Sequence, residues 1–107
     1  MADQVLLAFS TFPDLETARR IVLALLESRL VACGNILPEI ESAYRWQGKI
    51  ETSSEVLAFF KLPAPGYAAF EAKLKELHPY EVPEIMAVEI DKGLPEYLRW
   101  AAKLGEI

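Results

Sequence analysis

The hydrophobic and polar positions near the start of the chain predict a strand followed by a helix. Residues 4–9 form a short, almost wholly apolar run, which is typical of a strand covered on both faces. Residues 15–26 carry apolar side chains at helical spacing with charged residues off that stripe, so we expect an amphipathic helix. The segment before it resembles a helix start, where either Thr11 or Asp14 would cap the first turn.

Two long strands joined by a tight turn are predicted next. Residues 30–37 form the first part, and Pro38 predicts a bend or bulge at a sheet edge. Gln47-Gly48 suits a two-residue hairpin turn, after which residues 49–62 return as the partner strand. That turn fixes four cross-strand pairs on one side of the ribbon, which are Trp46 with Lys49, Tyr44 with Glu51, Ser42 with Ser53, and Ile40 with Glu55.

The C-terminal half predicts a helix, a strand and a last helix. Pro65 suits a first helical position, and the second helix should end at His78-Pro79, because the residue before a proline is pushed out of the α region. Residues 82–90 read as a fourth strand. Apolar residues between 94 and 104 share one side of a last helix, which Gly105 would stop.

The order β-α-β-β-α-β plus a C-terminal helix predicts an α+β fold of the ferredoxin-like, split βαβ kind. We expect a single domain over residues 1–107, with a four-stranded antiparallel sheet, two helices on one face and a long central hairpin. The hairpin, roughly residues 39–56, is longer and more polar than such a domain requires, and an isolated hairpin is only marginally stable in water. Because the open face of the sheet also needs a cover, we expect an oligomer.

Composition narrows the class of protein. The 107 residues are 52% hydrophobic and 25% charged, which is typical of a globular chain. A net charge of −5 without a basic cluster disfavours nucleic acid as a partner, and the apolar runs are too short for a signal peptide or a membrane span, so we expect no membrane partner. The single cysteine, Cys33, allows no internal disulfide and suits a reducing compartment, so we expect a cytoplasmic protein.

His78 is the only histidine, and the sequence leaves three roles open for it. It could interact with the dipole at a helix C-terminus, bind a metal, or act as an acid–base catalyst. A metal site needs three or four donors, and the other candidates are Cys33, Tyr80, Glu81 and Glu84. No nucleophile motif, phosphate-binding loop or HExxH sequence is present, so we expect no enzyme.

The ribbon face that carries Tyr44, Trp46, Lys49 and Glu51 has two interpretations. Tryptophan and tyrosine are enriched at protein interfaces, so this face could contact another subunit. It could also form one wall of a ligand-binding cleft at the margin of that contact. We favour the interface and keep the cleft as the alternative.

Four stretches together resemble the CutA divalent-cation-tolerance family over essentially the whole chain: LVACGNI (30–36), SAYRWQGKIE (42–51), HPYEVPEI (78–85) and YLRW (97–100). The resemblance implies a tight homotrimer with hairpins reaching across subunits, and a role in tolerance of divalent cations, chiefly through copper binding. The architecture is also similar to trimeric nitrogen-regulatory PII signalling proteins. A sensor with a small ligand in the cleft between subunits is therefore the alternative function.

Carried over to this chain, the family motifs imply two sets of site residues. The ligand cleft would contain Tyr44, Trp46, Lys49, Glu51, Glu55, Tyr80 and Pro83, and the motif also includes Gly48. Copper or another divalent cation would be bound by Cys33, His78 and Glu81, which we do not expect to converge tightly, because Cys33 lies in a strand and His78 at a helix end. Gly34 departs from the larger residue common in the family, and we expect looser packing beside Cys33.

Overall fold

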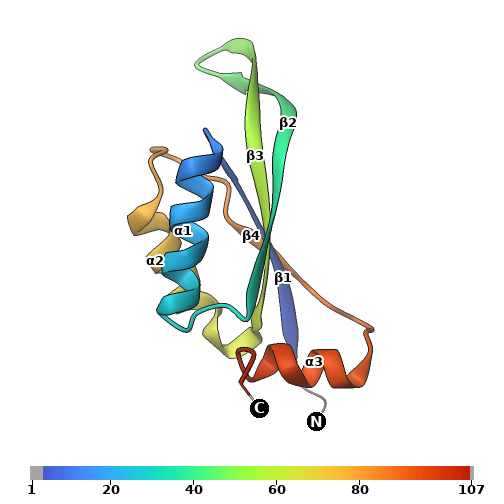
Figure 1. The fold of residues 1–107 in the computed structure, drawn as a ribbon. Coiled ribbons are helices and arrows are strands. Elements are labelled where there is room, and N and C mark those ends of the chain that lie inside the picture. Colours follow the sequence, from blue (N-terminus) through green and yellow to red (C-terminus); the bar gives the residue numbers. More distant parts are fainter. Residues whose placement is uncertain (1–3, 107) are drawn as a thin grey trace.

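The structure is a computed structural model that describes residues 4–106. The elements in chain order are β1 (Val5–Phe12), α1 (Leu15–Glu27), β2 (Cys33–Trp46), β3 (Lys49–Pro63), the short 3-10 helix η1 (Ala64–Gly66), α2 (Tyr67–Leu77), β4 (Met86–Glu89) and α3 (Pro95–Ala102). The strands form one antiparallel sheet in the order β2-β3-β1-β4. Helices α1 and α2 lie side by side along one face, and α3 lies at the end of the sheet where β1 begins (Figure 1). This arrangement confirms the predicted ferredoxin-like α+β fold.

Alternate residues of β3 supply the sheet side of the core. Four of them are buried, namely Val56, Ala58, Phe60 and Leu62. They pack in one cluster with buried residues of β1 and of both neighbouring helices, namely Phe12, Ile21, Leu25, Phe70 and Leu74. Because successive side chains of a strand point to opposite faces, Leu57, Phe59 and Lys61 lie on the other face of the sheet. We call that side the open face.

Asp14 is the cap of α1, as one of the two sequence interpretations predicted. Its Oδ1 accepts a hydrogen bond from the Thr17 backbone N–H at 2.7 Å. The alternative cap, Thr11, is part of β1, which continues to Phe12 and so beyond the predicted strand over residues 4–9. The strand is longer because Phe12 pairs with Val56 and its side chain is buried in the core.

The central hairpin has the predicted register. All four expected cross-strand pairs are present, and the ladder shifts between Leu37 and Ile40, where Pro38 predicted a bulge. Gln47 and Gly48 both have positive φ, at 49° and 80°, which is the backbone conformation of a type I′ turn. The hairpin extends beyond the helices (Figure 1), and the molecule measures 46 × 26 × 23 Å.

Two strands are shorter than predicted. β2 begins at Cys33 rather than at residue 30. β4 covers only Met86–Glu89 instead of residues 82–90, because Pro83 has no N–H to donate and β1 pairs with β4 only from Leu6 to Phe9. The segment that precedes β4 therefore stays outside the sheet.

Gly34 does not loosen the packing, contrary to the sequence expectation, because α1 fills the space. A Cβ atom at this position would lie 2.7 Å from Val22 Cγ1 and 3.4 Å from Phe60 Cδ1. Val22 is buried and β-branched, so its side chain has little freedom to rotate away within a helix. The glycine allows α1 to approach β2 closely.

Replacing Gly34 by alanine is expected to lower the free energy of unfolding by about 1–3 kcal/mol, the usual cost of overpacking a core. Equilibrium chemical denaturation measures the change. The matched background is Val22→Ala, which removes the conflicting methyl groups. Gly34→Ala should cost much less in that background, and an equal loss in both backgrounds would contradict the steric explanation.

Candidate functional site

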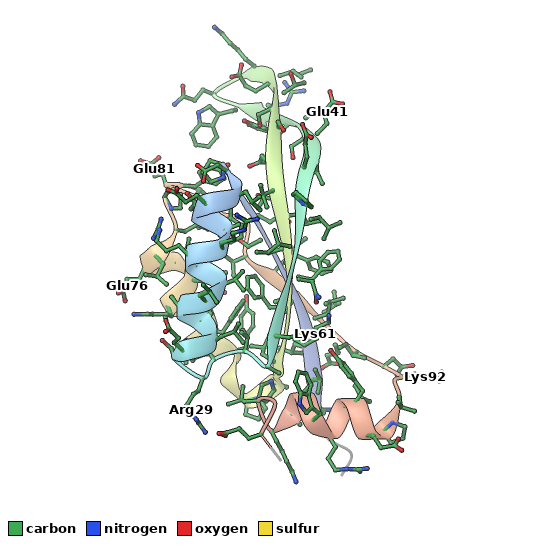
Figure 2. All side chains as sticks on the ribbon, viewed as in Figure 1. Arg29, Glu41, Lys61, Glu76, Glu81 and Lys92 are labelled. Carbon is green, nitrogen blue, oxygen red and sulfur yellow. The ribbon has the colours of Figure 1, made fainter. Side chains whose placement is uncertain are left out.

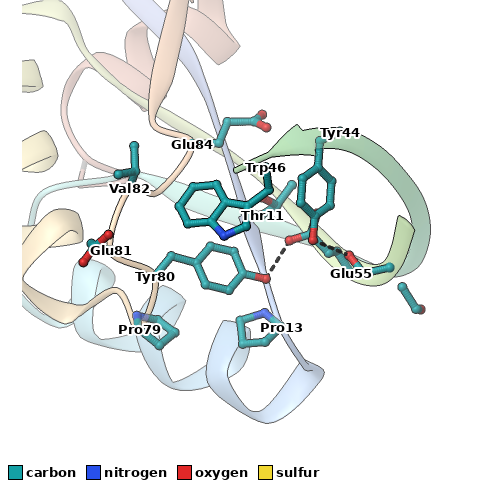
Figure 3. A pocket seen from close by; sticks show the side chains of 12 residues that line it. Thr11, Pro13, Tyr44, Trp46, Glu55, Pro79, Tyr80, Glu81, Val82 and Glu84 are labelled. Atoms are coloured by element: carbon teal, nitrogen blue, oxygen red, sulfur yellow. Dashed lines mark hydrogen bonds between the residues drawn. The ribbon is translucent and has the colours of Figure 1, made fainter. Parts of the chain in front are cut away.

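A cavity of about 610 Å³ opens beyond the end of β1, between the hairpin and residues 79–84 (Figure 3). Its position follows from the fold, because β1 ends at Phe12 while β2 and β3 continue past it. The segment between α2 and β4 crosses this gap. The lining residues are Thr11, Pro13, Tyr44, Trp46, Ser53, Ser54, Glu55, Pro79, Tyr80, Glu81, Val82 and Glu84.

Tyr80 connects the two walls of the cavity. Its hydroxyl donates a hydrogen bond to Glu55 Oε2 at 2.6 Å, drawn as a dashed line in Figure 3. Burial, with the hydrogen bond to Glu55 as the next cause, raises the pKa of Tyr80 well above 10, so the phenol keeps its proton at neutral pH. On the hairpin, the hydroxyls of Tyr44 and Ser53 lie 3.3 Å apart and form a hydrogen bond. These two bonds hold both tyrosines at the cavity.

His78 lies behind this wall and is 7% exposed. Its ring stacks on Phe12, with centroids 4.9 Å apart and planes 14° apart. Nε2 lies 2.8 Å from the Thr11 carbonyl oxygen, and Nδ1 lies 3.1 Å from the Tyr80 backbone nitrogen. A carbonyl only accepts and an amide N–H only donates, so the ring is the neutral tautomer with its proton on Nε2.

This environment decides what His78 can do. Burial lowers the pKa of His78 below its ordinary 6.5, although the Thr11 hydrogen bond and the charge of Glu55 act in the opposite direction. Both ring nitrogens are engaged with the backbone at the two sides of the cavity wall. A metal ion or a proton-transfer step at His78 would have to break one of these bonds.

Cys33 lies on the open face, where it begins β2 opposite Lys61. Its Sγ is 3.7 Å from the Tyr97 hydroxyl of α3, close enough for a weak hydrogen bond. Burial, and then the bond with Cys33, raises the pKa of Tyr97 to about 12. The thiol is half-buried, and the polar groups of residues 4–106 within hydrogen-bond distance of it are the neutral side chains of Tyr97 and Asn35.

The three predicted metal ligands are not brought together within one chain. His78 stacks on Phe12, which pairs with Val56 on the helix-covered face, whereas Cys33 pairs with Lys61 on the open face. Val56 and Lys61 are five positions apart along β3, about 16 Å at the usual rise of a strand. Figure 2 shows Glu81 beside the start of α1 and Lys61 on the part of the sheet closer to α3.

Most of the predicted cleft residues are brought together. Tyr44, Trp46, Glu55 and Tyr80 all line the cavity, and so does Glu81, which the sequence assigned to the metal set. Three others lie outside the lining: Lys49 and Glu51 are exposed on the hairpin, and Pro83 is half-buried between two lining residues. The sequence did not place Thr11, Pro13, Ser53, Ser54, Pro79, Val82 or Glu84 in the cleft. The hairpin register could have indicated Ser53, which shares a ribbon side with Tyr44.

A metal site does not form from one chain over residues 4–106, because no group of three histidine, cysteine, aspartate or glutamate side chains converges there. Copper and other divalent cations need about three or four donors. The residues present therefore do not fit such a cation within a single copy. In the same range, no helix has the length and apolar character needed to cross a membrane.

Comparison with known proteins places the chain in a family. The family model described as CutA1 divalent ion tolerance protein matches residues 6–104. The divalent-cation tolerance protein CutA of Thermus thermophilus is 46% identical over 90 residues, covering 84% of this chain and 87% of its own. Protein CutA of mouse is 41% identical over 99 residues, but these cover 92% of this chain and only 56% of the mouse protein.

Solved structures agree with this placement. The periplasmic divalent cation tolerance protein CutA from Archaeoglobus fulgidus superposes with a TM-score of 0.90 at 37% identity, over 95% of this chain and 99% of that one. These relatives give no support to the PII-like alternative. The fold, the matched motifs and the extent of the family match together show that the chain belongs to the CutA1 divalent ion tolerance protein family.

Proposed function

We propose that this protein is a non-catalytic, divalent-cation-binding protein that works as a homotrimer and binds copper between its subunits. The observation that carries the proposal is the position of Cys33 on a sheet face that residues 4–106 cover only at one end. Copies that cover this face would bring several thiols toward one another. The family's link to divalent ion tolerance supports the class of ligand.

The open face is the part of the surface that another subunit would cover. Leu7, Phe9, Leu57 and Phe59 are only partly buried there. Met86 and Val88 extend the same surface across β4 and are 52% and 53% exposed. A contiguous exposed apolar patch can mark an interaction site. A second copy would bury the patch, and the number three follows the family resemblance.

Copper is the metal that we propose among the divalent cations. Among divalent first-row metals Cu²⁺ heads the affinity order for nitrogen, oxygen and sulfur ligands, and its reduced form, Cu⁺, is a soft ion that thiolates select. Since one chain supplies no cluster of three donors over residues 4–106, the remaining ligands would come from other copies. Cys33 is the favoured ligand, whereas His78 already uses both nitrogens within its own chain.

A non-catalytic role is supported by the state of the only histidine. Catalysis by a nucleophile requires a base within hydrogen-bond reach. His78 Nε2 and Nδ1 are held by backbone groups, and Cys33 lies on the opposite face of the sheet. A cytoplasmic location is also part of the proposal, supported by the lone half-buried thiol.

Native mass spectrometry during a copper titration, with and without reductant, tests this proposal. We expect a trimeric mass and a whole number of bound coppers that disappear in Cys33→Ser. The matched control is Met86→Leu, which removes the other described sulfur from the same face and should leave copper binding unchanged. A monomeric mass, or the same copper stoichiometry in Cys33→Ser, would contradict the proposal.

A further inference from the structure

We propose that the cavity between the hairpin and residues 79–84 binds a small organic cation, such as one that carries a methylated ammonium group, between aromatic rings and carboxylates. The cavity residues lie away from Cys33, so this inference goes beyond the proposed copper binding and does not depend on it. The argument rests on the size of the cavity, its aromatic surface and the sign of its charge.

The size and shape fit a small molecule. Ligand pockets commonly enclose about 300–1,000 Å³, and this cavity encloses about 610 Å³. Its walls come from different parts of the chain, namely the end of β1, the hairpin and the segment after α2. The Tyr80–Glu55 hydrogen bond joins two of these walls, so the cavity is formed without a ligand.

Three aromatic rings border the cavity from two sides. Tyr44 and Trp46 come from the hairpin and Tyr80 from the facing segment, as Figure 3 shows. Tyr44 is 44% exposed and Trp46 46% exposed, so much of their ring surface can be reached by a ligand. An organic cation over the face of an aromatic ring is attracted by the ring quadrupole, most strongly over tryptophan.

The charged lining is entirely acidic. Glu55, Glu81 and Glu84 contribute carboxylates, and the lining contains no lysine, arginine or histidine. An anionic ligand would meet only repulsion from these groups. Glu55 accepts one hydrogen bond from Tyr80 and retains further acceptor capacity for a cationic ligand.

The spacing of the carboxylates favours an organic cation over a metal ion. A metal requires its donors within about 2–2.6 Å of one point, and in the described range these carboxylates form no such group. A methylated ammonium spreads its charge over a larger radius and binds water weakly. It can therefore gain from separated carboxylates and ring faces together.

Isothermal titration calorimetry of the intact protein with choline tests the inference. The matched neutral ligand is 3,3-dimethylbutan-1-ol, which has the same shape without the charge. We expect choline to bind at least tenfold more tightly than the alcohol, and Trp46→Leu and Glu84→Gln each to weaken choline binding by fivefold or more. Both residues are exposed in the single chain, so these variants should keep its fold, and sedimentation velocity checks that they keep the assembly of the parent.

Glu96→Gln is the charge control, because Glu96 is exposed on α3 at the far end of the molecule. It should leave choline binding unchanged. Equal binding of choline and the alcohol, no binding of either, or equal weakening by Glu96→Gln and Glu84→Gln would overturn the inference. Displacement of choline by one equivalent of copper would also overturn it, since the cavity would then be the metal site.

Discussion

Replacing His78 by alanine is expected to lower the free energy of unfolding by about 3 kcal/mol. The change would leave the buried Thr11 carbonyl without its His78 partner, at a cost of about 1–3 kcal/mol, and the partly buried Tyr80 N–H would lose its acceptor as well. It would also open a gap against the face of Phe12. Equilibrium denaturation at pH 7.5 measures the loss.

His78→Gln is the matched variant, since an amide can supply one donor and one acceptor near the same positions. It should recover part of the stability lost in His78→Ala. The same variants decide between a structural and a metal-binding histidine. A His78→Ala protein that kept its stability but lost its copper would contradict the structural role.

The pH dependence of stability gives a second readout of His78. Because burial lowers the pKa of His78 in the folded state, the unfolded chain binds the proton more readily, near pH 6.5. The stability that the neutral His78 ring adds to the folded state is fully present above pH 6.5. It is lost progressively as the pH falls from 6.5 toward the lower pKa of His78 in the folded state. His78→Gln should remove this decline, and an unchanged decline in His78→Gln would assign it to other groups.

If the protein is the proposed trimer, the double substitution Met86→Glu and Val88→Glu is expected to convert it to monomers. Both side chains are more than half exposed in the single chain, so the change costs the isolated fold little. In the proposed assembly the same positions would bury two carboxylates in an apolar contact, at several kcal/mol for each unpaired charge. Sedimentation velocity measures the shift in mass.

Leu23→Glu is the control for this experiment. Leu23 is an apolar residue with a similar exposure, 59%, but it lies on α1 and therefore on the other side of the sheet. It should leave the trimer intact. Dissociation by Leu23→Glu as well, or an unchanged mass in the Met86/Val88 variant, would contradict assembly through the open face.

The sequence was most informative where local rules decide the structure. Gln47-Gly48 sets the turn, and alternation along both strands sets the register, so the pairing of Tyr44 with Glu51 was predictable. Pro38 indicated the bulge for the same kind of reason. The predicted bounds of the fourth strand, residues 82–90, were wrong, because an apolar run does not reveal how far its partner strand extends.

The state of His78 could not be predicted, because it depends on a tertiary contact. Its hydrogen-bond acceptor, the Thr11 carbonyl, lies 67 positions away along the chain. The same limit applies to the cavity, where Thr11 and Pro13 meet Tyr80 only after the sheet has formed. The hairpin half of the cavity could be predicted from the sequence, since strand alternation placed Tyr44 and Trp46 on one side of the ribbon.

The bulge at Pro38 has a consequence for aggregation. β2 is an edge strand, and an edge with a continuous row of free N–H and C=O groups is a template onto which further chains can add as a fibril. Pro38 offers no N–H, and the register shift between Leu37 and Ile40 bends the ladder at the same place. An incoming strand could match only one side of the bulge at a time. The bulge therefore shortens the continuous edge along which a further strand could add to this hairpin.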